Sequence, residues 1–353
     1  MGICISLSSS EIHEADDCHQ DNLLFLPENV SSLGIQGLGS LYTKQGSKGL
    51  NQDAAIFYQL WVSFSLFLFF KDYGMEGGAF CGVFDGHGKN GHIVSNMVRN
   101  RLPSMLLGQK NALEKNCQHQ AAKIDAKSLP SNGFLNWREA CITAFKVLDK
   151  EIMLQENLDC STSGTTAVVV VRQSEDLVIA NLGDSRAVLG TMTESGIKAV
   201  QLTTDLKPGL PCEAERIRNC RGRVLALKEE PHIQRVWLPH EDSPGLAMSR
   251  AFGDFLLKNH GIIAVPDVFH HQLTHNDRFI VLATDGVWDV LNNNQVATIV
   301  MEAENEQAAA RAVVEAATAT WKKKFPCSKV DDCTVVCLFL QKKQKPSSLA
   351  AAI

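Results

Sequence analysis

Short apolar runs that meet an aspartate recur along this chain and form its clearest pattern. Each run has five to eight residues and is bounded by glycine or polar turn residues, which is typical of a buried strand. The aspartate stands where the strand would leave its sheet, so its carboxylate would be held at the sheet edge. The four runs are residues 54–58 after Asp53, 79–84 before Asp85, 278–284 before Asp285 and 333–340 after Asp331.

Further strands are predicted in the middle of the chain. Residues 164–171, 176–182 and 185–190 are predicted to form consecutive antiparallel strands, joined by Ser-Glu-Asp and Gly-Asp turns. Near the start, residues 41–45 and 54–58 flank a turn that contains two glycines and Lys48. This arrangement predicts another hairpin.

Other segments repeat apolar residues every three or four positions, the period of an amphipathic helix. We predict two further helices at residues 292–300 and 306–321, and a surface loop over the polar residues 108–133. Because strands and helices fall in separate groups, an α+β layering is favoured. The two clearest helical sets are Ile93, Val94, Met97, Val98, Leu102 and Leu106, and Trp137, Cys141, Ala144, Phe145, Leu148 and Ile152.

The turn that follows residues 79–84 combines residue types suited to metal and proton chemistry. Gly86 and Gly88 permit backbone conformations closed to other residues and leave a carbonyl open to a hard cation, while His87 can give or take a proton near neutral pH. A cluster of strand-edge aspartates is costly unless cations neutralise it. Oxygen ligands without His or Cys pairs at metal spacing favour magnesium or manganese over zinc.

Seven short motifs stand in a fixed order between residues 42 and 340: LNQDA at 50–54, FDGHG at 84–88, SGTTA at 163–167, NLGDSRA at 181–187, LAMSRAFGD at 246–254, ATDGVWD at 283–289 and DDCTVV at 331–336. Together they resemble the motifs of metal-dependent type 2C Ser/Thr protein phosphatases, and the wording is closest to a plant subgroup. The resemblance implies a four-layer α/β/β/α sandwich of two antiparallel sheets flanked by helices, over residues 37–341. It also implies hydrolysis of phosphoserine and phosphothreonine in phosphorylated proteins.

The resemblance further implies roles for individual residues, with two Mn²⁺ or Mg²⁺ ions per subunit activating the attacking water. His87 would be the general acid that protonates the leaving oxygen, and Lys48 would bind the substrate phosphate. A third, weaker metal would lie at Asp184 and Asp289. The ligands of the two main ions would be Asp53 through water, Asp85 as the bridge, the carbonyl of Gly86, Asp285 and Asp331.

Three features depart from the family pattern. Lys48 stands where an arginine is common, and Gln52 stands where a glutamate is common, which would weaken one metal site. Residues 60–71 (LWVSFSLFLFFK) form an atypical apolar insertion, too short to span a membrane and explicable either as a genuine insertion or as a gene-model artefact. The alternative function is therefore a catalytically impaired phosphatase fold that binds or regulates at a membrane.

Two other phosphatase mechanisms compete for these residues. Cys212 and Arg218 have the Cys-x5-Arg spacing of thiolate phosphatases, but Glu213 and Glu215 fall inside the interval, where they would repel phosphate. Asp285 and Asp289 are four residues apart rather than two, so the nucleophile and acid pair of a haloacid-type phosphatase is missing. Neither mechanism is favoured.

Composition and the chain ends limit the partners and the compartment. Of 353 residues 45% are hydrophobic, and the net charge of -5 provides no basic face for nucleic acid. Eleven scattered cysteines indicate reduced thiols in the cytoplasm or nucleus, and we expect a monomer. Residues 1–36 and 342–353 are predicted to be disordered. Gly2 and Cys4 match a dual acylation pattern that would attach the protein to the plasma membrane.

Overall fold

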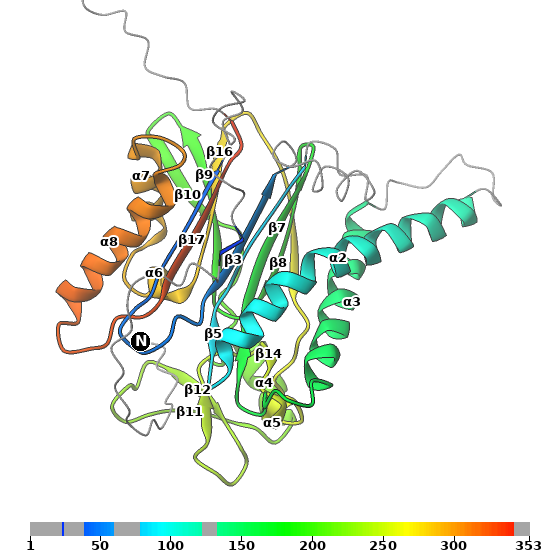
Figure 1. Ribbon diagram of the computed structural model, residues 1–353, viewed down its shortest axis with the longest axis vertical. Helices are drawn as coiled ribbons and strands as arrows, with labels where there is room; N and C mark the ends of the chain where they lie inside the picture. The colour runs from blue at the N-terminus through cyan, green and yellow to red at the C-terminus, as the bar shows by residue number, and fades with distance from the viewer. Residues whose placement is uncertain (1–22, 25–38, 60–77, 122–132, 342–353) are drawn as a thin grey trace, which may run out of the picture.

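Two antiparallel sheets lie face to face in this protein, with a pair of helices over the outer face of each (Figure 1). The computed structural model describes residues 23–24, 39–59, 78–121 and 133–341. The layer order is α2 and α3, first sheet, second sheet, then α7 and α8. The predicted α+β sandwich of four layers is therefore confirmed.

The first sheet is antiparallel except at one edge, where β1 runs parallel to β3. Strand β1 comes from the N-terminal segment predicted to be disordered, and the rest of residues 1–36 lies outside the described residues. In spatial order the strands are β1 (Leu23–Leu24), β3 (Ala54–Gln59), β4 (Ala79–Phe84), β7 (Ala167–Gln173), β8 (Asp176–Leu182) and β15 (Asp267–Gln272).

The second sheet is antiparallel throughout and is accompanied by two small sheets. Its spatial order is β10 (Gly196–Gln201), β9 (Arg186–Thr193), β16 (Asp277–Ala283), β17 (Cys333–Phe339) and β2 (Gly39–Lys44). The small sheets are β11 (Arg223–Ala226), β12 (Gln234–Trp237) and β13 (Pro244–Leu246), and β14 (Phe252–Gly253), β6 (Gly164–Thr165) and β5 (Gly86–His87).

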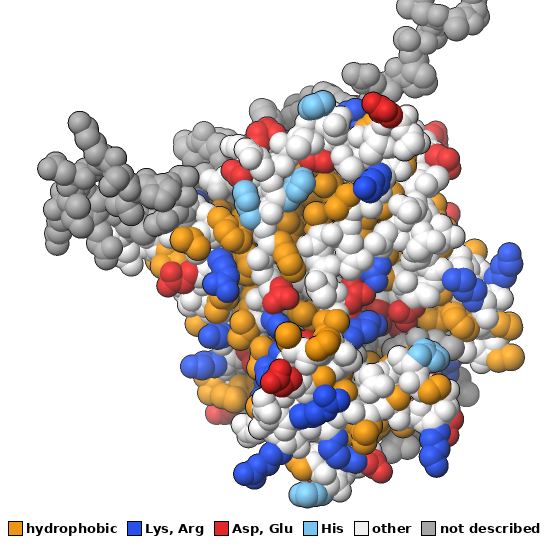
Figure 2. All heavy atoms as spheres, turned by 180° about the vertical axis from the view of Figure 1, so that it is seen from behind, with side chains coloured by type: hydrophobic (Ala, Val, Ile, Leu, Met, Phe, Trp, Pro, Cys, Tyr) orange, Lys and Arg blue, Asp and Glu red, His pale blue; other side chains and the backbone are white. Residues whose placement is uncertain are grey.

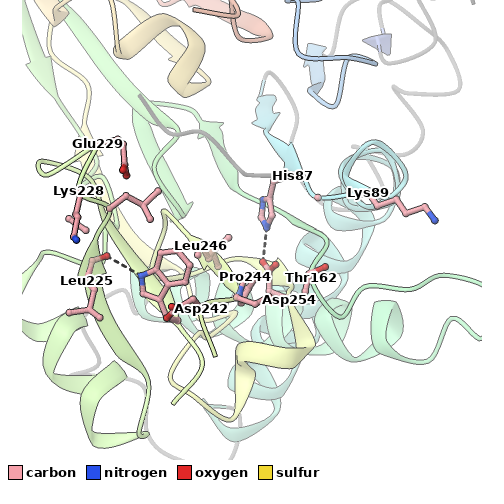
Figure 3. A pocket seen from close by; sticks show the side chains of 16 residues that line it. His87, Lys89, Thr162, Leu225, Lys228, Glu229, Asp242, Pro244, Leu246 and Asp254 are labelled. Atoms are coloured by element: carbon pink, nitrogen blue, oxygen red, sulfur yellow. Dashed lines mark hydrogen bonds and ion pairs between the residues drawn. The ribbon is translucent and has the colours of Figure 1, made fainter. Parts of the chain in front are cut away.

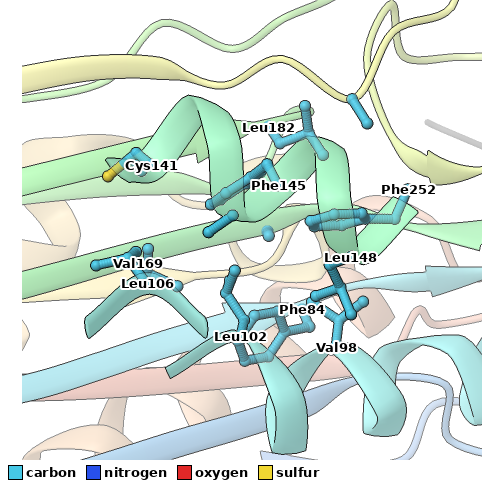
Figure 4. Packing of buried hydrophobic residues seen from close by; sticks show 14 of the residues in the cluster. Phe84, Val98, Leu102, Leu106, Cys141, Phe145, Leu148, Val169, Leu182 and Phe252 are labelled. Carbon is cyan, nitrogen blue, oxygen red and sulfur yellow. The ribbon is translucent and has the colours of Figure 1, made fainter. Parts of the chain in front are cut away.

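The central strands read as continuous apolar runs because both of their faces are buried. In β4, Phe80 and Phe84 pack towards α2 and α3, whereas Cys81 and Val83 pack towards the second sheet. Figure 4 shows Phe84 beside side chains of both helices in the outer cluster. Each such fully buried side chain stabilises the fold by about 1.5–3 kcal/mol. The apolar pattern therefore predicts that a strand is buried on both faces, but it does not predict which sheet the strand joins.

The predicted helices form, with one correction. All six apolar residues predicted for the second helical set are buried, and the loop predicted at residues 108–133 is wrong over its first half, because the helix continues to Ala121. Residues 122–132 lie outside the described residues. The helices are α2 (Gly91–Ala121), α3 (Gly133–Met153), α4 (Pro211–Asn219), α5 (Phe255–Lys258), α6 (Asp285–Trp288), α7 (Asn293–Glu302) and α8 (Ala309–Lys324).

Two predicted hairpins are wrong for the same reason. Strand β2 pairs with β17 in the second sheet, whereas β3 belongs to the first, so the turn that carries Lys48 crosses between sheets. The Gly183-Asp184 turn likewise connects β8 in the first sheet to β9 in the second. A crossover and a hairpin have the same local sequence when both strands are buried. The hairpin of β7 and β8 is confirmed.

The hairpin of β3 and β4 is regular along its whole length. Its register runs without a shift from Ala54↔Phe84 to Gln59↔Ala79. Asp53 and Asp85 flank the first of these pairs, and the predicted insertion at residues 60–71 follows the second but lies outside the described residues. Within the described part of the chain, no helix has the length and apolar character needed to cross a membrane. Eight of the cysteines there are free thiols: Cys81, Cys141, Cys160, Cys212, Cys220, Cys327, Cys333 and Cys337.

Candidate active site

The four strand-edge aspartates meet at one end of the sandwich. Strand β4 ends just before Asp85 and its antiparallel neighbour β3 begins just after Asp53. In the second sheet, β16 leads to Asp285 and its antiparallel neighbour β17 follows Asp331. An antiparallel pair places the end of one strand beside the start of the next, so each sheet contributes two carboxylates to the same end.

A cavity of about 150 Å³ opens between these strand ends. Of the predicted site residues, Asp53 and Asp289 are not among its lining, although their charges act on the carboxylates that are. The remainder line it together. The lining residues are Lys48, Gly49, Leu50, Gln52, Asp85, Gly86, His87, Gly88, Asp184, Ala247, Met248, Asp285, Asp331 and Asp332.

The glycines of the Asp-Gly-His-Gly turn are required for different reasons. A Cβ on Gly86 would stand 2.5 Å from the carbonyl oxygen of Gln52, so close backbone approach demands glycine there. Gly88 has φ +79°, a conformation that side chains rarely adopt. Both features pull the turn against the strand start that carries Asp53 and fix the direction of His87.

Burial and mutual repulsion disfavour the ionised form of these carboxylates. Burial raises the pKa of Asp85 well above its ordinary value, and the charges of Asp285 and Asp53 raise it further. Burial also raises the pKa of Asp285, reinforced by Asp289 and Asp331. The pKa of Asp53 is raised by burial and by Asp332. This is the electrostatic condition that a bound cation relieves.

Asp53 is fixed from behind the cavity. Its Oδ2 accepts a hydrogen bond of 2.9 Å from the hydroxyl of Thr284, the residue before Asp285. The same hydroxyl accepts a hydrogen bond of 3.1 Å from the backbone N–H of Thr334 in β17. One threonine therefore ties the carboxylate of the first sheet to both strands of the second sheet that lead into the cavity.

Two lysines partly compensate the negative charge. Lys48 forms an ion pair with Asp331, and although burial opposes its charge, Asp331 and Asp285 hold the pKa of its ammonium above the ordinary value. Lys207 lies 3.3 Å from Oδ2 of Asp184, whose charge raises the pKa of the lysine. Neither oxygen of Asp184 accepts a well-aligned hydrogen bond from the described residues.

The donor set fits a hard divalent cation. Every candidate ligand is an oxygen, the carboxylates at the cavity outnumber the ammonium groups of Lys48 and Lys207, and Asp184 retains buried oxygens that lack a hydrogen-bond donor. Within the described residues, no three Asp, Glu, His or Cys side chains already enclose a point at metal-ligand distance. The carboxylates therefore gather at the cavity without closing on a common centre.

Sequence reasoning missed how the turn that carries Lys48 is held. The half-buried carboxylate of Asp332 accepts hydrogen bonds of 2.8 Å from the backbone N–H groups of Gly46 and Gln52. Burial raises the pKa of Asp332 to about 6. The side-chain amide of Gln52 donates a 2.7 Å hydrogen bond to the carbonyl of Gly88. The aspartate doublet at 331–332 was the available signal for this positioning role.

His87 is buried and paired with a residue that the sequence did not single out. Its Nε2 lies 2.7 Å from Oδ2 of Asp254, the last residue of the LAMSRAFGD motif. Both side chains also border a second, larger cavity of about 760 Å³ beneath β11–β13, in which Figure 3 shows them pointing towards each other. His87 and Gly88 are common to the two cavities.

Cys212 and Arg218 do not form the phosphate-binding loop of a thiolate phosphatase. Cys212 and Arg218 lie on α4, a regular helix, rather than in a loop of inward-pointing amides. Between them, Glu213 is buried and bonded to Arg216 and Arg250. Figure 2 shows acidic and basic side chains interspersed over one face of the protein, with no extended basic surface there.

Comparisons with known proteins agree with this arrangement. The family model for protein phosphatase 2C matches residues 71–323. Probable protein phosphatase 2C 72 of Arabidopsis thaliana is 53% identical over 98% of this chain and 100% of its own length. Probable protein phosphatase 2C 12 of Oryza sativa is 45% identical over 96% of this chain and 92% of its own.

A solved structure is similar as well. The crystal structure of serine-threonine phosphatase 2C from Toxoplasma gondii matches with a TM-score of 0.69 and 26% identity, covering 85% of this chain and 94% of that one. One assignment follows from the ordered motifs, the four-layer fold, the match to the family model and the relatives that align over nearly the full length. The chain belongs to the protein phosphatase 2C family and is a Ser/Thr protein phosphatase.

Proposed function

We propose that this phosphatase hydrolyses phosphoserine and phosphothreonine at the carboxylate cavity with two Mn²⁺ or Mg²⁺ ions, and that His87 is its general acid. The family uses manganese or magnesium and acts on phosphorylated proteins. The observation that carries the proposal is the gathering of Asp85, Asp285 and Asp331 around a small cavity that His87 also lines.

Each residue has a part in this scheme. Asp53, Asp85, the carbonyl of Gly86, Asp285 and Asp331 would hold the two ions, and Asp184 with Asp289 would hold a third, weaker one. Bound divalent cations would lower the pKa of a water molecule towards neutrality and offset the charge of the phosphate. Lys48 sits at the mouth of the cavity, where its ammonium would meet a phosphate oxygen as a point charge.

Metal dependence is the test. Phosphate release from a phosphothreonine peptide is measured with added Mn²⁺, with added Mg²⁺ and after exhaustive chelation, while circular dichroism shows that the chelated protein stays folded. We expect activity with either ion and none after chelation. Turnover that survives chelation would contradict the proposal.

The rival function, an impaired phosphatase fold that acts as a binding protein, has two grounds. One is the replacements at Lys48 and Gln52, and the other is that the insertion would distort the hairpin that carries Asp53 and Asp85. The unbroken register of β3 and β4 argues against such distortion. At about 3.4 Å per residue, the six residues of β3 span roughly 20 Å, so Gln59 lies at the end of the strand far from Asp53. We therefore expect the same metal-dependent activity with and without residues 60–71. Activity that appears only after their removal would favour the binding protein.

A further inference from the structure

We propose that Asp254 is a positioning residue for His87: it holds the Nε2–H of the imidazole, so that Nδ1 is the nitrogen that gives the proton to the leaving oxygen. This inference rests on the proposed function, because it assumes that His87 is the general acid. It adds the residue that orients the ring and the atom that carries the proton.

The contact itself is close and dry. Nε2 of His87 lies 2.7 Å from Oδ2 of Asp254, and the side chains are 5% and 1% exposed. A carboxylate only accepts hydrogen bonds, so the hydrogen is on Nε2. Nδ1 is buried and has no hydrogen-bond partner among the described residues. The ring therefore has one nitrogen engaged and one without a hydrogen-bond partner among the described residues.

A three-stranded miniature sheet brings the two residues together. Strand β6 lies between β5 and β14, and its Gly164 is the register partner of both His87 and Gly253. A Cβ on Gly164 would stand 2.6 Å from Oδ2 of Asp254 and 2.9 Å from Nε2 of His87. The pair can form only because the central strand has a glycine between them.

The backbone at Asp254 points to the same conclusion. Its φ of 50° and ψ of 43° lie in the left-handed region, which is unfavourable for a residue with a side chain. The segment is nevertheless held: the N–H of Asp254 donates to the carbonyl of Ser163 at 3.0 Å, and the N–H of Gly253 donates to Asp149 at 2.9 Å. Strain that the surroundings maintain in this way gathers at functional sites.

The step is balanced as follows. Oxygen from water forms a bond to phosphorus, the bond from phosphorus to the serine or threonine oxygen breaks, and its electron pair stays on that oxygen. The imidazolium of His87 gives the proton on Nδ1 to this oxygen and becomes neutral, keeping its hydrogen on Nε2. Asp254 takes no proton in this step, and the proton lost by the attacking water returns to Nδ1 through solvent.

The test uses Asp254→Asn in the full chain with Mg²⁺, because asparagine keeps the size and tolerates left-handed backbone. We expect the turnover of a phosphothreonine peptide to fall by roughly tenfold to a hundredfold, no more than the about 10² to 10⁴ that a general acid contributes. An activated aryl phosphate, which needs no proton on its leaving group, should lose no more than about threefold. In a His87→Ala background, Asp254→Asn should lower neither rate further.

Asp176→Asn is the matched control. Asp176 also lies 2.7 Å from a histidine Nε2, that of His270, but this pair is exposed and borders neither cavity. It should alter neither activity. An equal loss on both substrates in Asp254→Asn, or a further loss in the His87→Ala background, would overturn the proposal. If His87→Ala itself lowered the turnover of both substrates equally, the assignment of His87 as general acid would fail. That outcome is distinguishable from failure of the role proposed for Asp254.

A second measurement needs no substitution at Asp254. In Mg²⁺-loaded protein labelled with ¹⁵N-histidine, the signal of His87 is assigned by its absence in His87→Ala. We expect the pattern of a ring with hydrogen on Nε2. A neutral ring with its only hydrogen on Nδ1 would overturn the proposal even if Asp254→Asn failed to fold.

Discussion

Two groups of buried carboxylates in this protein have opposite electrostatic settings. Glu213 in α4 is 3% exposed, and hydrogen bonds from Arg216, Arg250 and Ser249 outweigh the effect of burial and lower its pKa to about 2. Asp85 and Asp285 are also buried, yet their pKa values are raised well above the ordinary value. The chain neutralises Glu213 with the guanidinium groups of Arg216 and Arg250, whereas the carboxylates at the cavity outnumber the nearby ammonium groups. Under the proposed function, these are the carboxylates whose charge an external cation would neutralise.

Removing a charge from each group should change stability in opposite directions. Asp285→Asn should reduce metal-dependent turnover by more than about a hundredfold, since even residues behind a metal ligand cost about 10–100-fold. In metal-free protein it should raise the free energy of unfolding, on the order of 1 kcal/mol per unit of pKa shift relieved. Urea denaturation in EDTA and a phosphopeptide assay measure the two effects. A metal-free variant less stable than the parent protein would break the comparison.

Glu213→Gln should act the other way. It leaves the guanidinium groups of Arg216 and Arg250 without their shared carboxylate, so the free energy of unfolding should fall by roughly 3 kcal/mol, the lower end for breaking a buried ion pair. Urea denaturation measures this change. Glu151→Gln is the control, because its pair with Arg101 is exposed and should contribute no more than about 1 kcal/mol. Equal effects of the two substitutions would remove the distinction.

The pH dependence of metal-free protein sharpens the comparison. The cavity carboxylates have raised pKa values, so the folded state binds more protons than the unfolded state and stability should increase as pH falls from 8 through the pKa of Asp332, about 6. The contribution of Glu213 is complete above its ordinary 4.5 and is lost as pH falls towards about 2. Maximum stability is therefore expected near pH 5.

Urea midpoints between pH 8 and pH 3 in EDTA would show this maximum. Saturating Mg²⁺ should abolish the rise on acidification, since a cation prefers ionised carboxylates. The contrary result is a metal-free midpoint that only declines from pH 8 downwards.

The sequence predicted burial, most element types and seven of the residues that line the cavity, but not the connections between sheets. The turn with Lys48 and the Gly183-Asp184 turn were both taken for hairpins. A continuous apolar run shows that both faces of a strand are covered, and it is the same whether the next strand pairs in the same sheet or crosses to the other. Each crossover carries a residue that lines the cavity, Lys48 in one and Asp184 in the other. The two wrongly predicted connections therefore lie at the candidate site itself.

Asp254 was missed because nothing local distinguishes it. It lies 167 positions from His87, and its left-handed backbone is imposed by contacts with residues 149 and 163 rather than by its own sequence. Asp332 was seen only as the neighbour of Asp331, although its carboxylate holds the turn with Lys48. Positioning residues of this kind act through distant hydrogen bonds, which a linear pattern does not contain.

The carboxylates at the cavity come from both sheets, so the apolar layer between the sheets sets the distance between them. Asp85 follows a strand of the first sheet and Asp285 follows a strand of the second. The distance between them therefore depends on the side chains packed between the sheets, such as Val168 and Ile280. Facing sheets stand about 10 Å apart, and a methylene more or less in that layer alters the spacing. Substitutions well away from the cavity would therefore change the distance between Asp85 and Asp285 and, under the proposed function, the radius of the ion that fits between them.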